Sequence, residues 1–303
     1  MRERRLEVEV DGRLLSVANL DKVLYPASGF TKGDLISYYV AVAPAILGHL
    51  AGRPVTLARF PDGVEGRSFL EKHVPAHAPA WLETVEVPRV LGRRTRRDAL
   101  EQAVVSSVAG LVWAANLAAI ELHVPMWRVD TGPSPRPDLV VFDLDPGPGV
   151  GVLECIPVAV ALRRELEARG LEAVPKTSGR KGLHLYARLE PPRAWQDVRS
   201  EAYEVARRIE AEEPRRVVTS MARARRPGRV LIDWSQNHPA KTTVAAYSLR
   251  AEATPSVSAP LRWEELAAAE RAGRADGLRF RPAEVLARLD RYGDLFAGLA
   301  VRS

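Results

Sequence analysis

The feature that most constrains the fold of this chain is an apolar run that ends in two aspartates and a turn. Residues 139–142 read Leu-Val-Val-Phe, and Asp143, Leu144 and Asp145 follow before Pro146-Gly147-Pro148-Gly149. Side chains alternate between the two faces of a strand, so Asp143 and Asp145 project from the same face. The sequence therefore predicts a strand over 138–145 that ends in two carboxylates about 7 Å apart, from a rise of ~3.4 Å per residue.

A third acid has the same setting, because Asp233 ends the apolar run 230–232. Close carboxylates repel unless a cation lies between them, and their oxygens suit Mg²⁺ or Mn²⁺. Three of them can hold two divalent ions that activate an attacking oxygen and stabilise a leaving one. Two other interpretations stay open on these residues alone. They are a haloacid-dehalogenase-like phosphotransferase with Asp143 as nucleophile, whose motif has Thr or Val where Gly147 stands, and a nucleotide-sugar transferase.

The string over 176–186 is typical of a phosphate-binding turn. Glycines let backbone amides turn towards an anion, while hydroxyl, ammonium and imidazole groups add donors. The alternative is a glycine-rich hairpin with incidental basic residues. With two downstream residues that could reach the same nucleotide, the candidate set is Ser178, Lys181, Gly182, His184, Gln236 and Arg250.

Composition narrows the class of protein. The 303 residues carry 44 Lys+Arg against 38 Asp+Glu, a net charge of +6 that fits a polyanionic partner. One cysteine, Cys155, excludes an internal disulfide framework and a cysteine-rich zinc site, so a reducing cytoplasm is the expected compartment. No apolar signal core follows Met1, and no membrane association is expected. Two basic clusters predict a track for a phosphate backbone: Arg89, Arg93, Arg94, Arg96 and Arg97, then Arg215, Arg216, Arg223, Arg225, Arg226 and Arg229.

Strand and helix patterns are mixed without strict alternation, which favours an α+β protein of two lobes. Three prolines in residues 131–137 indicate a connector between lobes. Thr31 and Asp34 form a weak capping pattern for a helix over 35–50. The other expected elements are a hairpin over 6–17, strands over 53–60, 183–189 and 230–233, and helices over 98–121, 152–169, 195–211, 262–272 and 282–290.

Seven ordered motifs together give a family resemblance. They are Asn19-Leu-Asp-Lys-Val-Leu-Tyr-Pro26, Arg59-Phe-Pro-Asp-Gly63, Glu121-Leu-His123, Phe142-Asp-Leu-Asp-Pro146, Ser178-Gly-Arg-Lys-Gly-Leu-His184, Asp233-Trp-Ser-Gln-Asn237 and Tyr247-Ser-Leu-Arg250. The chain resembles the polymerase domain of bacterial ATP-dependent DNA ligase D, of the archaeo-eukaryotic primase superfamily, in a stand-alone form. The resemblance implies a two-lobed primase-type fold with central mixed or antiparallel sheets flanked by helices. It implies one domain over 1–303, with an N-terminal lobe contacting DNA ends (1–130), a catalytic lobe (131–255) and a C-terminal helical tail (256–303).

The resemblance also assigns roles to residues. Catalysis and metal binding fall to Asp143, Asp145 and Asp233. Nucleotide binding falls to Ser178, Lys181, Gly182, His184, Gln236, Arg250, His123 and Arg226. Asn19, Lys22 and Lys32 would hold the 5′-phosphate of a downstream strand, Phe69 would stack on the template, and Arg59 and Lys72 would contact the DNA backbone. Leu70 stands where relatives carry a second aromatic residue, which implies weaker template gripping.

By this resemblance the expected function is nucleotidyl transfer to a primer 3′-OH at gaps and double-strand breaks, in non-homologous end joining. Two Mn²⁺ or Mg²⁺ ions would serve as cofactors, and NTPs, preferred over dNTPs, as substrates. The expected partners are gapped or broken DNA with a 5′-phosphate, Ku and a separate DNA ligase, in the bacterial cytoplasm at the nucleoid. The rival from another class is a non-catalytic module that bridges DNA ends, which shares the basic loops but needs no acid triad.

Overall fold

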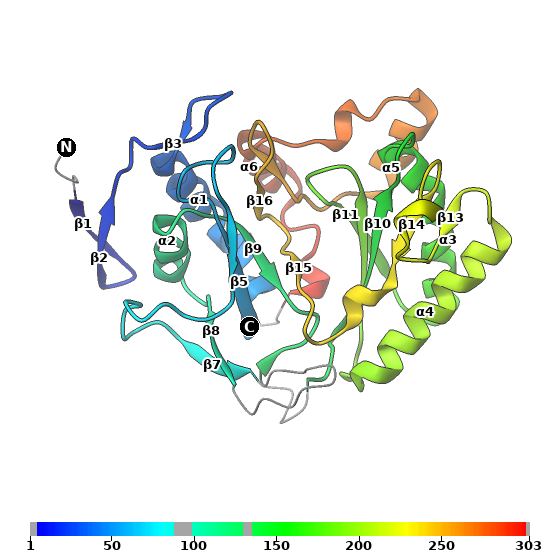
Figure 1. The fold of residues 1–303 in the computed structure, drawn as a ribbon, viewed down its shortest axis with the longest axis horizontal. Helices are drawn as coiled ribbons and strands as arrows, with labels where there is room; N and C mark the ends of the chain where they lie inside the picture. Colours follow the sequence, from blue (N-terminus) through cyan, green and yellow to red (C-terminus); the bar gives the residue numbers. More distant parts are fainter. Residues whose placement is uncertain (1–4, 88–98, 130–134, 301–303) are drawn as a thin grey trace.

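The computed structural model describes residues 5–87, 99–129 and 135–300. Two separate main sheets stand side by side in it, each with helices packed beside it (Figure 1). Strands and helices follow one another without strict alternation, which confirms the predicted α+β class. The first basic cluster, at 89–97, lies outside the described residues.

The first main sheet has six strands in the order β15-β9-β5-β8-β7, with β6 paired to β5. All of these pairings are antiparallel. Its strands are β5 (Pro54–Arg59), β6 (Phe69–Glu71), β7 (Thr84–Val87), β8 (Leu100–Val104), β9 (Ala119–Val124) and β15 (Thr243–Val244). Helices α1 (Lys32–Leu50) and α2 (Val108–Asn116) pack against each other beside this sheet. By length and composition α1 could cross a membrane, but Leu35, Tyr39 and Ile46 are fully buried, so its apolar face belongs to the core.

The described residues 99–121 do not form the single helix that the apolar composition of 98–121 predicts. They make β8, the short α2 and the start of β9. The Ser107 hydroxyl accepts from the Gly110 amide at 3.2 Å and so begins α2 late. Ala118, with φ of 55°, turns the chain out of the helix and into β9. Both strands and the helix are largely buried, so apolar content alone does not distinguish them.

The second main sheet is mixed and has the order β11-β12-β10-β14-β13. Only β13 and β14 run parallel, and the other pairs are antiparallel. Its strands are β10 (Leu139–Pro146), β11 (Ala173–Thr177), β12 (Leu183–Arg188), β13 (Val217–Val218) and β14 (Val230–Asp233). Helices α3 (Val152–Glu167) and α4 (Trp195–Glu212) cover it on the outer side of the molecule (Figure 1). The strand predicted to carry the paired aspartates therefore lies at the centre of this sheet.

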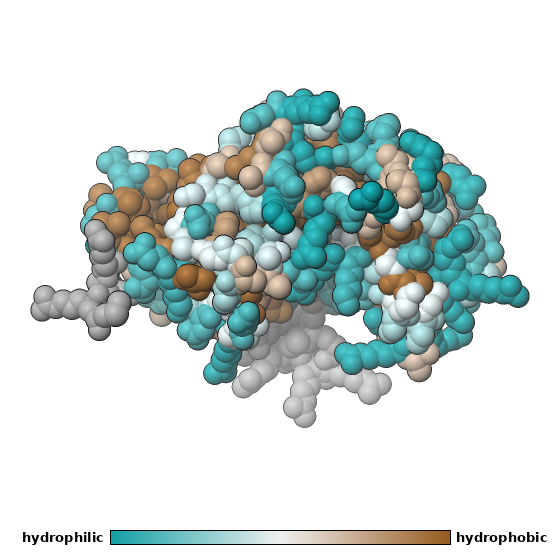
Figure 2. All heavy atoms as spheres, turned by 90° about the horizontal axis from the view of Figure 1, so that it is seen from above, coloured by the Kyte–Doolittle hydropathy of each residue, from teal (hydrophilic) through white to brown (hydrophobic). Residues whose placement is uncertain are grey.

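Short hairpins complete the N-terminal part. β1 (Arg5–Val10) and β2 (Arg13–Ala18) form the predicted antiparallel hairpin. β3 (Val23–Tyr25) and β4 (Phe30–Thr31) form a second hairpin, and the predicted capping pair then begins α1. Apolar residues gather at the end of the molecule that carries these elements, and hydrophilic residues cover its middle (Figure 2). The large exposed apolar residues of this part include Leu6, Leu14, Val23 and Val40.

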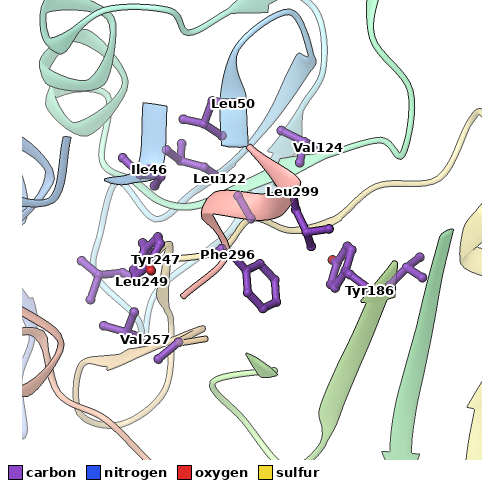
Figure 3. Packing of buried hydrophobic residues seen from close by; sticks show 14 of the residues in the cluster. Ile46, Leu50, Leu122, Val124, Tyr186, Tyr247, Leu249, Val257, Phe296 and Leu299 are labelled. Atoms are coloured by element: carbon purple, nitrogen blue, oxygen red, sulfur yellow. The ribbon is translucent and has the colours of Figure 1, made fainter. Parts of the chain in front are cut away.

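The C-terminal part joins the two halves. The small hairpin of β16 (Leu249–Arg250) and β17 (Ser256–Val257) precedes α5 (Trp263–Ala272) and α6 (Pro282–Tyr292). The segment 294–299 then enters the core, where the ring of Phe296 lies between Tyr247 and Tyr186 (Figure 3). The predicted boundaries at 130 and 255 stay predictions, and β15 pairs with β9 of the first sheet.

Candidate nucleotide and metal site

The three predicted metal-binding acids are brought together by strand register. Asp143 in β10 lies directly opposite Asp233 in β14, and Asp145 lies opposite Leu231. Leu144 between the two β10 acids is fully buried, as strand alternation requires. Backbone pairing therefore places the three acids beside one another although 88 positions separate Asp145 from Asp233.

Each of these carboxylates already contacts a polar neighbour. Asp143 Oδ1 is 3.3 Å from Nε2 of His184, and Asp145 Oδ2 is 3.6 Å from Nη1 of Arg226. The carboxylate of Asp233 is held by its own turn, η3 (Trp234–Asn237). Its Oδ1 accepts from the Ser235 amide at 3.0 Å, and its Oδ2 accepts from Nε2 of Gln236 at 2.9 Å. Across residues 5–87, 99–129 and 135–300, no three His, Cys, Asp or Glu side chains are grouped as a metal site would need, so the three-acid metal site stays a prediction.

The electrostatics of the acid pair suit a cation. Burial raises the pKa of Asp145, and the negative charge of Asp143 raises it further. Burial alone would also raise the pKa of Asp143, but the neighbouring His184 lowers it. A divalent cation would relieve the repulsion between the two carboxylates, and oxygen ligands are those that Mg²⁺ and Mn²⁺ prefer. The donor chemistry of this carboxylate pair therefore suits the metal that the sequence predicts.

His184 is a neutral imidazole at neutral pH. Burial, and then the positive charge of Lys176, lower the pKa of His184 to about 4. Its Nδ1 is buried and has no hydrogen-bond partner within the described part of the chain. The ring therefore orients Asp143 through Nε2 and, being neutral, adds no positive charge next to that carboxylate.

The glycine turn between β11 and β12 has a structural as well as a binding role. The Ser178 hydroxyl accepts from the amides of Arg180 and Gly182 at 3.2 and 3.1 Å, which closes the turn. A Cβ on Gly182 would come within 1.9 Å of the Leu144 carbonyl oxygen, so only glycine allows β12 to approach β10 here. The hydrogen of the Ser178 hydroxyl is not used by these two bonds.

A cavity of about 350 Å³ opens between this turn and the acidic strand. It contains most of the predicted nucleotide-binding residues, together with two of the acids. The predicted residues that line it are His123, Asp143, Asp145, Ser178, Lys181, Gly182, His184, Gln236 and Arg250. Arg226 reaches the cavity only through its ion pair with Asp145. The turn and the acids thus line one pocket, with basic side chains on the turn and carboxylates on β10.

Sequence reasoning missed three charged residues at this pocket. Arg180 and Glu252 line the cavity, and Glu121 is buried behind it. The Glu121-Leu-His123 string was noted, but only its histidine received a role. The available signal was a glutamate inside the apolar strand run 119–124, where a charged side chain needs partners.

The predicted 5′-phosphate residues lie together around the β3–β4 hairpin, apart from this cavity. The Lys22 amide donates to the Asn19 carbonyl at 3.0 Å, and the Lys32 amide donates to the Lys22 carbonyl at 2.8 Å. Lys22 is exposed and pairs with Asp62 at 3.2 Å, whereas Lys32 is buried and donates to the Ala18 carbonyl at 2.7 Å. Their role in binding phosphate stays a prediction.

The predicted template and DNA-backbone residues lie at the edge of the first sheet. The guanidinium of Arg59 lies 5.1 Å from the ring centroid of Phe69 and forms an ion pair with Glu71 at 2.8 Å. Phe69 and Leu70 are exposed and border a hollow of about 880 Å³, and Lys72 donates to the Ala240 carbonyl. One face of Phe69 is thus covered by Arg59, while its exposed surface borders open space.

Known proteins identify the class to which this fold and pocket belong. The solved structure of the polymerase domain from Mycobacterium tuberculosis Ligase D in complex with DNA is similar, with a TM-score of 0.86 and 41% identity over 94% of this chain and 97% of that one. The model of the family described as "LigD, primase-polymerase domain" matches residues 31–296. The chain therefore belongs to the LigD primase-polymerase domain family, and the predicted primase-type fold is confirmed.

Longer relatives share this domain. The multifunctional non-homologous end joining protein LigD of Mycolicibacterium smegmatis is 42% identical over 93% of this chain. The bifunctional non-homologous end joining protein LigD of Bacillus subtilis is 30% identical over 83% of it. The chain spans 36% and 39% of the length of these two relatives.

Proposed function

We propose that this chain is a DNA-directed nucleotidyltransferase of the primase type. In this proposal it extends a primer 3′-OH with NTPs or dNTPs at gaps and double-strand break ends. The observation that carries the proposal is the register pairing of Asp143 with Asp233 beside a basic pocket, in a member of the LigD primase-polymerase domain family. A non-catalytic bridging module has no need for these acids.

The residues divide the work in a simple way. Lys181 and Arg250 neutralise the charge of a triphosphate, and His184 orients Asp143. Two divalent ions held by the acids would supply activation of the 3′-hydroxyl and charge for the leaving pyrophosphate. Gln236 holds Asp233, so nucleotide contact at Gln236 and the placement of the third acid are linked.

The setting in the cell belongs to the same proposal. Gapped or broken DNA with a 5′-phosphate is the partner, with Lys22 and Lys32 as its anchor. Ku and a separate ligase are the protein partners, in the bacterial cytoplasm at the nucleoid. The support is that the relatives are non-homologous end joining proteins.

The Asp143→Ala variant tests the proposal. Purified wild-type protein with Mn²⁺ should add nucleotides to a 5′-phosphorylated gapped duplex, and addition should fall to background with EDTA. Asp143→Ala should abolish extension and leave DNA binding nearly unchanged, because the predicted DNA contacts lie elsewhere. Product length on a sequencing gel and fluorescence anisotropy of labelled DNA are the two measurements.

The exposed acid Asp276, paired with Arg274 far from the pocket, provides the matched control. Asp276→Ala should extend primers like wild type. Wild-type protein that binds the gapped duplex but adds no nucleotide with Mn²⁺ or Mg²⁺ would show that the chain is a bridging module instead. Parallel reactions with NTPs and dNTPs measure the substrate preference.

A further inference from the structure

Glu121 is a buried acid behind the nucleotide pocket that accepts from several pocket residues at once. It lies in β9 of the first sheet and is 3% exposed. Its Oε2 is 2.8 Å from Nε2 of His123, and its Oε1 accepts from Nη2 of Arg180 at 3.0 Å. Oε1 also accepts from the Ala251 amide at 3.0 Å and lies 3.4 Å from Nε of Arg250. The contacts come from β9 itself, from the β11–β12 turn and from the chain at β16.

The charge of Glu121 is what allows two arginines to approach the same place. Burial on its own would raise the pKa of Glu121, but the hydrogen bond from His123 and the charge of Arg250 lower it to about 2. The carboxylate is therefore ionised at neutral pH. Without it, the half-exposed Arg180 would repel the buried Arg250 without compensation from Glu121. Glu121 thus offsets the cost of gathering positive charge before any phosphate arrives.

The arrangement also bridges the two main sheets. β9 belongs to the first sheet, and Arg180 follows β11 of the second (Figure 1). A second acid, Glu252, lines the cavity, and its Oε1 lies 2.8 Å from Nε of Arg180. Arg250 is buried, and its Nε has no hydrogen-bond partner among the described residues, so its guanidinium is placed by charge. Glu121 is thus the acid that contacts both arginines, while Glu252 is a second partner of Arg180.

We infer that Glu121 is a positioning residue that orients His123, Arg180 and Arg250 for the phosphates of the incoming nucleotide. Arg180 is thereby a further phosphate contact of this chain. The inference rests on the proposed function, because it assumes a nucleoside triphosphate in this pocket. Glu121 does not line the cavity and has no contact with the acids of β10, so its effect is on nucleotide affinity rather than on the chemical step.

The Glu121→Gln variant tests this inference because it keeps the size and removes the charge. Binding of ATP with Mn²⁺ is measured by calorimetry, and gap filling opposite a templating thymine gives KM and kcat. Loss of one charge-assisted contact predicts about tenfold weaker ATP binding and a KM raised to match, with kcat nearly unchanged. Affinity for the 5′-phosphorylated duplex should stay at the wild-type value. Arg180→Gln should weaken ATP binding in the same direction, and adding Glu121→Gln to it should cost less than in the wild-type background.

Glu265→Gln is the matched control, since Glu265 also pairs with two arginines, Arg288 and Arg262, but lies in α5 and pairs with Arg288 of α6. It should lower the melting temperature and leave KM for ATP unchanged. Wild-type ATP affinity in Glu121→Gln overturns the inference, as does an equal loss of affinity in Glu265→Gln. If Glu121→Gln does not fold, Glu121→Asp, which retracts the charge, carries the same test. Wild-type protein that binds ATP but extends no primer removes the polymerase proposal alone, and wild-type protein that does not bind ATP removes both.

Discussion

At the scale of single residues, the buried lysine Lys176 controls the charge around the acidic strand. It lies opposite His184 in the β11–β12 pairing and is 1% exposed. Its Nζ donates to the Ser258 hydroxyl at 2.5 Å. Burial, and then the charge of Arg250, hold the pKa of Lys176 well below its usual range. A cation that is costly to keep charged thus lies beside the histidine that orients Asp143.

Replacing this lysine should change how His184 titrates. The positive charge of Lys176 opposes protonation of His184, so Lys176→Met should raise the His184 pKa above its value of about 4. The pKa should remain below the usual value of about 6.5 because burial, the larger cause, is unchanged. NMR titration of the His184 ring gives the measurement. Lys181→Met, which removes an exposed lysine of the same turn, should leave the His184 pKa nearly unchanged, and an equal rise in both variants would contradict the assignment.

The sequence could predict site residues only where a local pattern marks them. Asp143 and Asp145 follow an apolar run, and Ser178 and Lys181 stand next to glycines. Arg180 stands in the same glycine string, whereas the local signal at Glu121 is only that of an acid inside an apolar run. Apart from His123, two positions away, the partners of Glu121 are 59 and more positions away in the chain, so its importance depends on tertiary contacts. Position in the fold, rather than residue type, makes Glu121 part of the site.

At the scale of elements, prediction succeeded where end signals accompany periodicity. The helices at α1, α3, α4, α5 and α6 and the strands at β5, β10, β12 and β14 lie where the sequence predicts them. The helix predicted over 98–121 was wrong because a buried strand and a buried helix have the same apolar composition. What separates them there is the Ser107 cap and the turn at Ala118, whose effects depend on neighbouring elements.

The cap of α1 gives a prediction at this scale. The Thr31 hydroxyl accepts from the Asp34 amide at 3.2 Å, and Asp34 accepts from the Thr31 amide at 2.8 Å. Thr31→Ala should lower the free energy of unfolding by about 1 kcal/mol, because the Asp34 amide loses its hydroxyl acceptor and the Asp34 carboxylate loses the Thr31 hydroxyl as a donor. Urea unfolding measures the change. Thr31→Ser keeps the hydroxyl and should retain most of the stability, so an equal loss in both variants would show that the cap is not the cause.

At the scale of the whole molecule, the C-terminal segment connects the two halves. Phe296 packs against His49 of α1 and Tyr186 of β12, with ring centroids 6.1 and 5.8 Å apart. Two residues earlier, Asp294 accepts from the Tyr247 hydroxyl at 2.6 Å and lies 2.9 Å from Nε2 of His49. One short segment therefore contacts the second sheet, the loop between β15 and β16, and the first helix.

The stability of this junction should depend on pH. Burial alone would raise the pKa of Asp294, but the hydrogen bond and charge of His49 and the Tyr247 hydroxyl lower it. A lowered pKa in the folded state adds stability that is present above about pH 4, the unfolded value, and is lost as the pH falls through the folded value. Asp294→Asn should therefore cost about 2 kcal/mol at pH 7 and much less at pH 3. Denaturant unfolding at both pH values measures this, and a cost that stays constant with pH would contradict it.

Because Asp143 pairs directly with Asp233, the register between β10 and β14 sets the relative positions of the two acids. Adding or removing one residue in either strand would rotate every later side chain to the opposite face and send one acid into the apolar interior. Such strands tolerate exchanges between similar side chains but not a change in length. Gene variants of this domain should accordingly collect insertions in the connecting loops and almost none between 139 and 145.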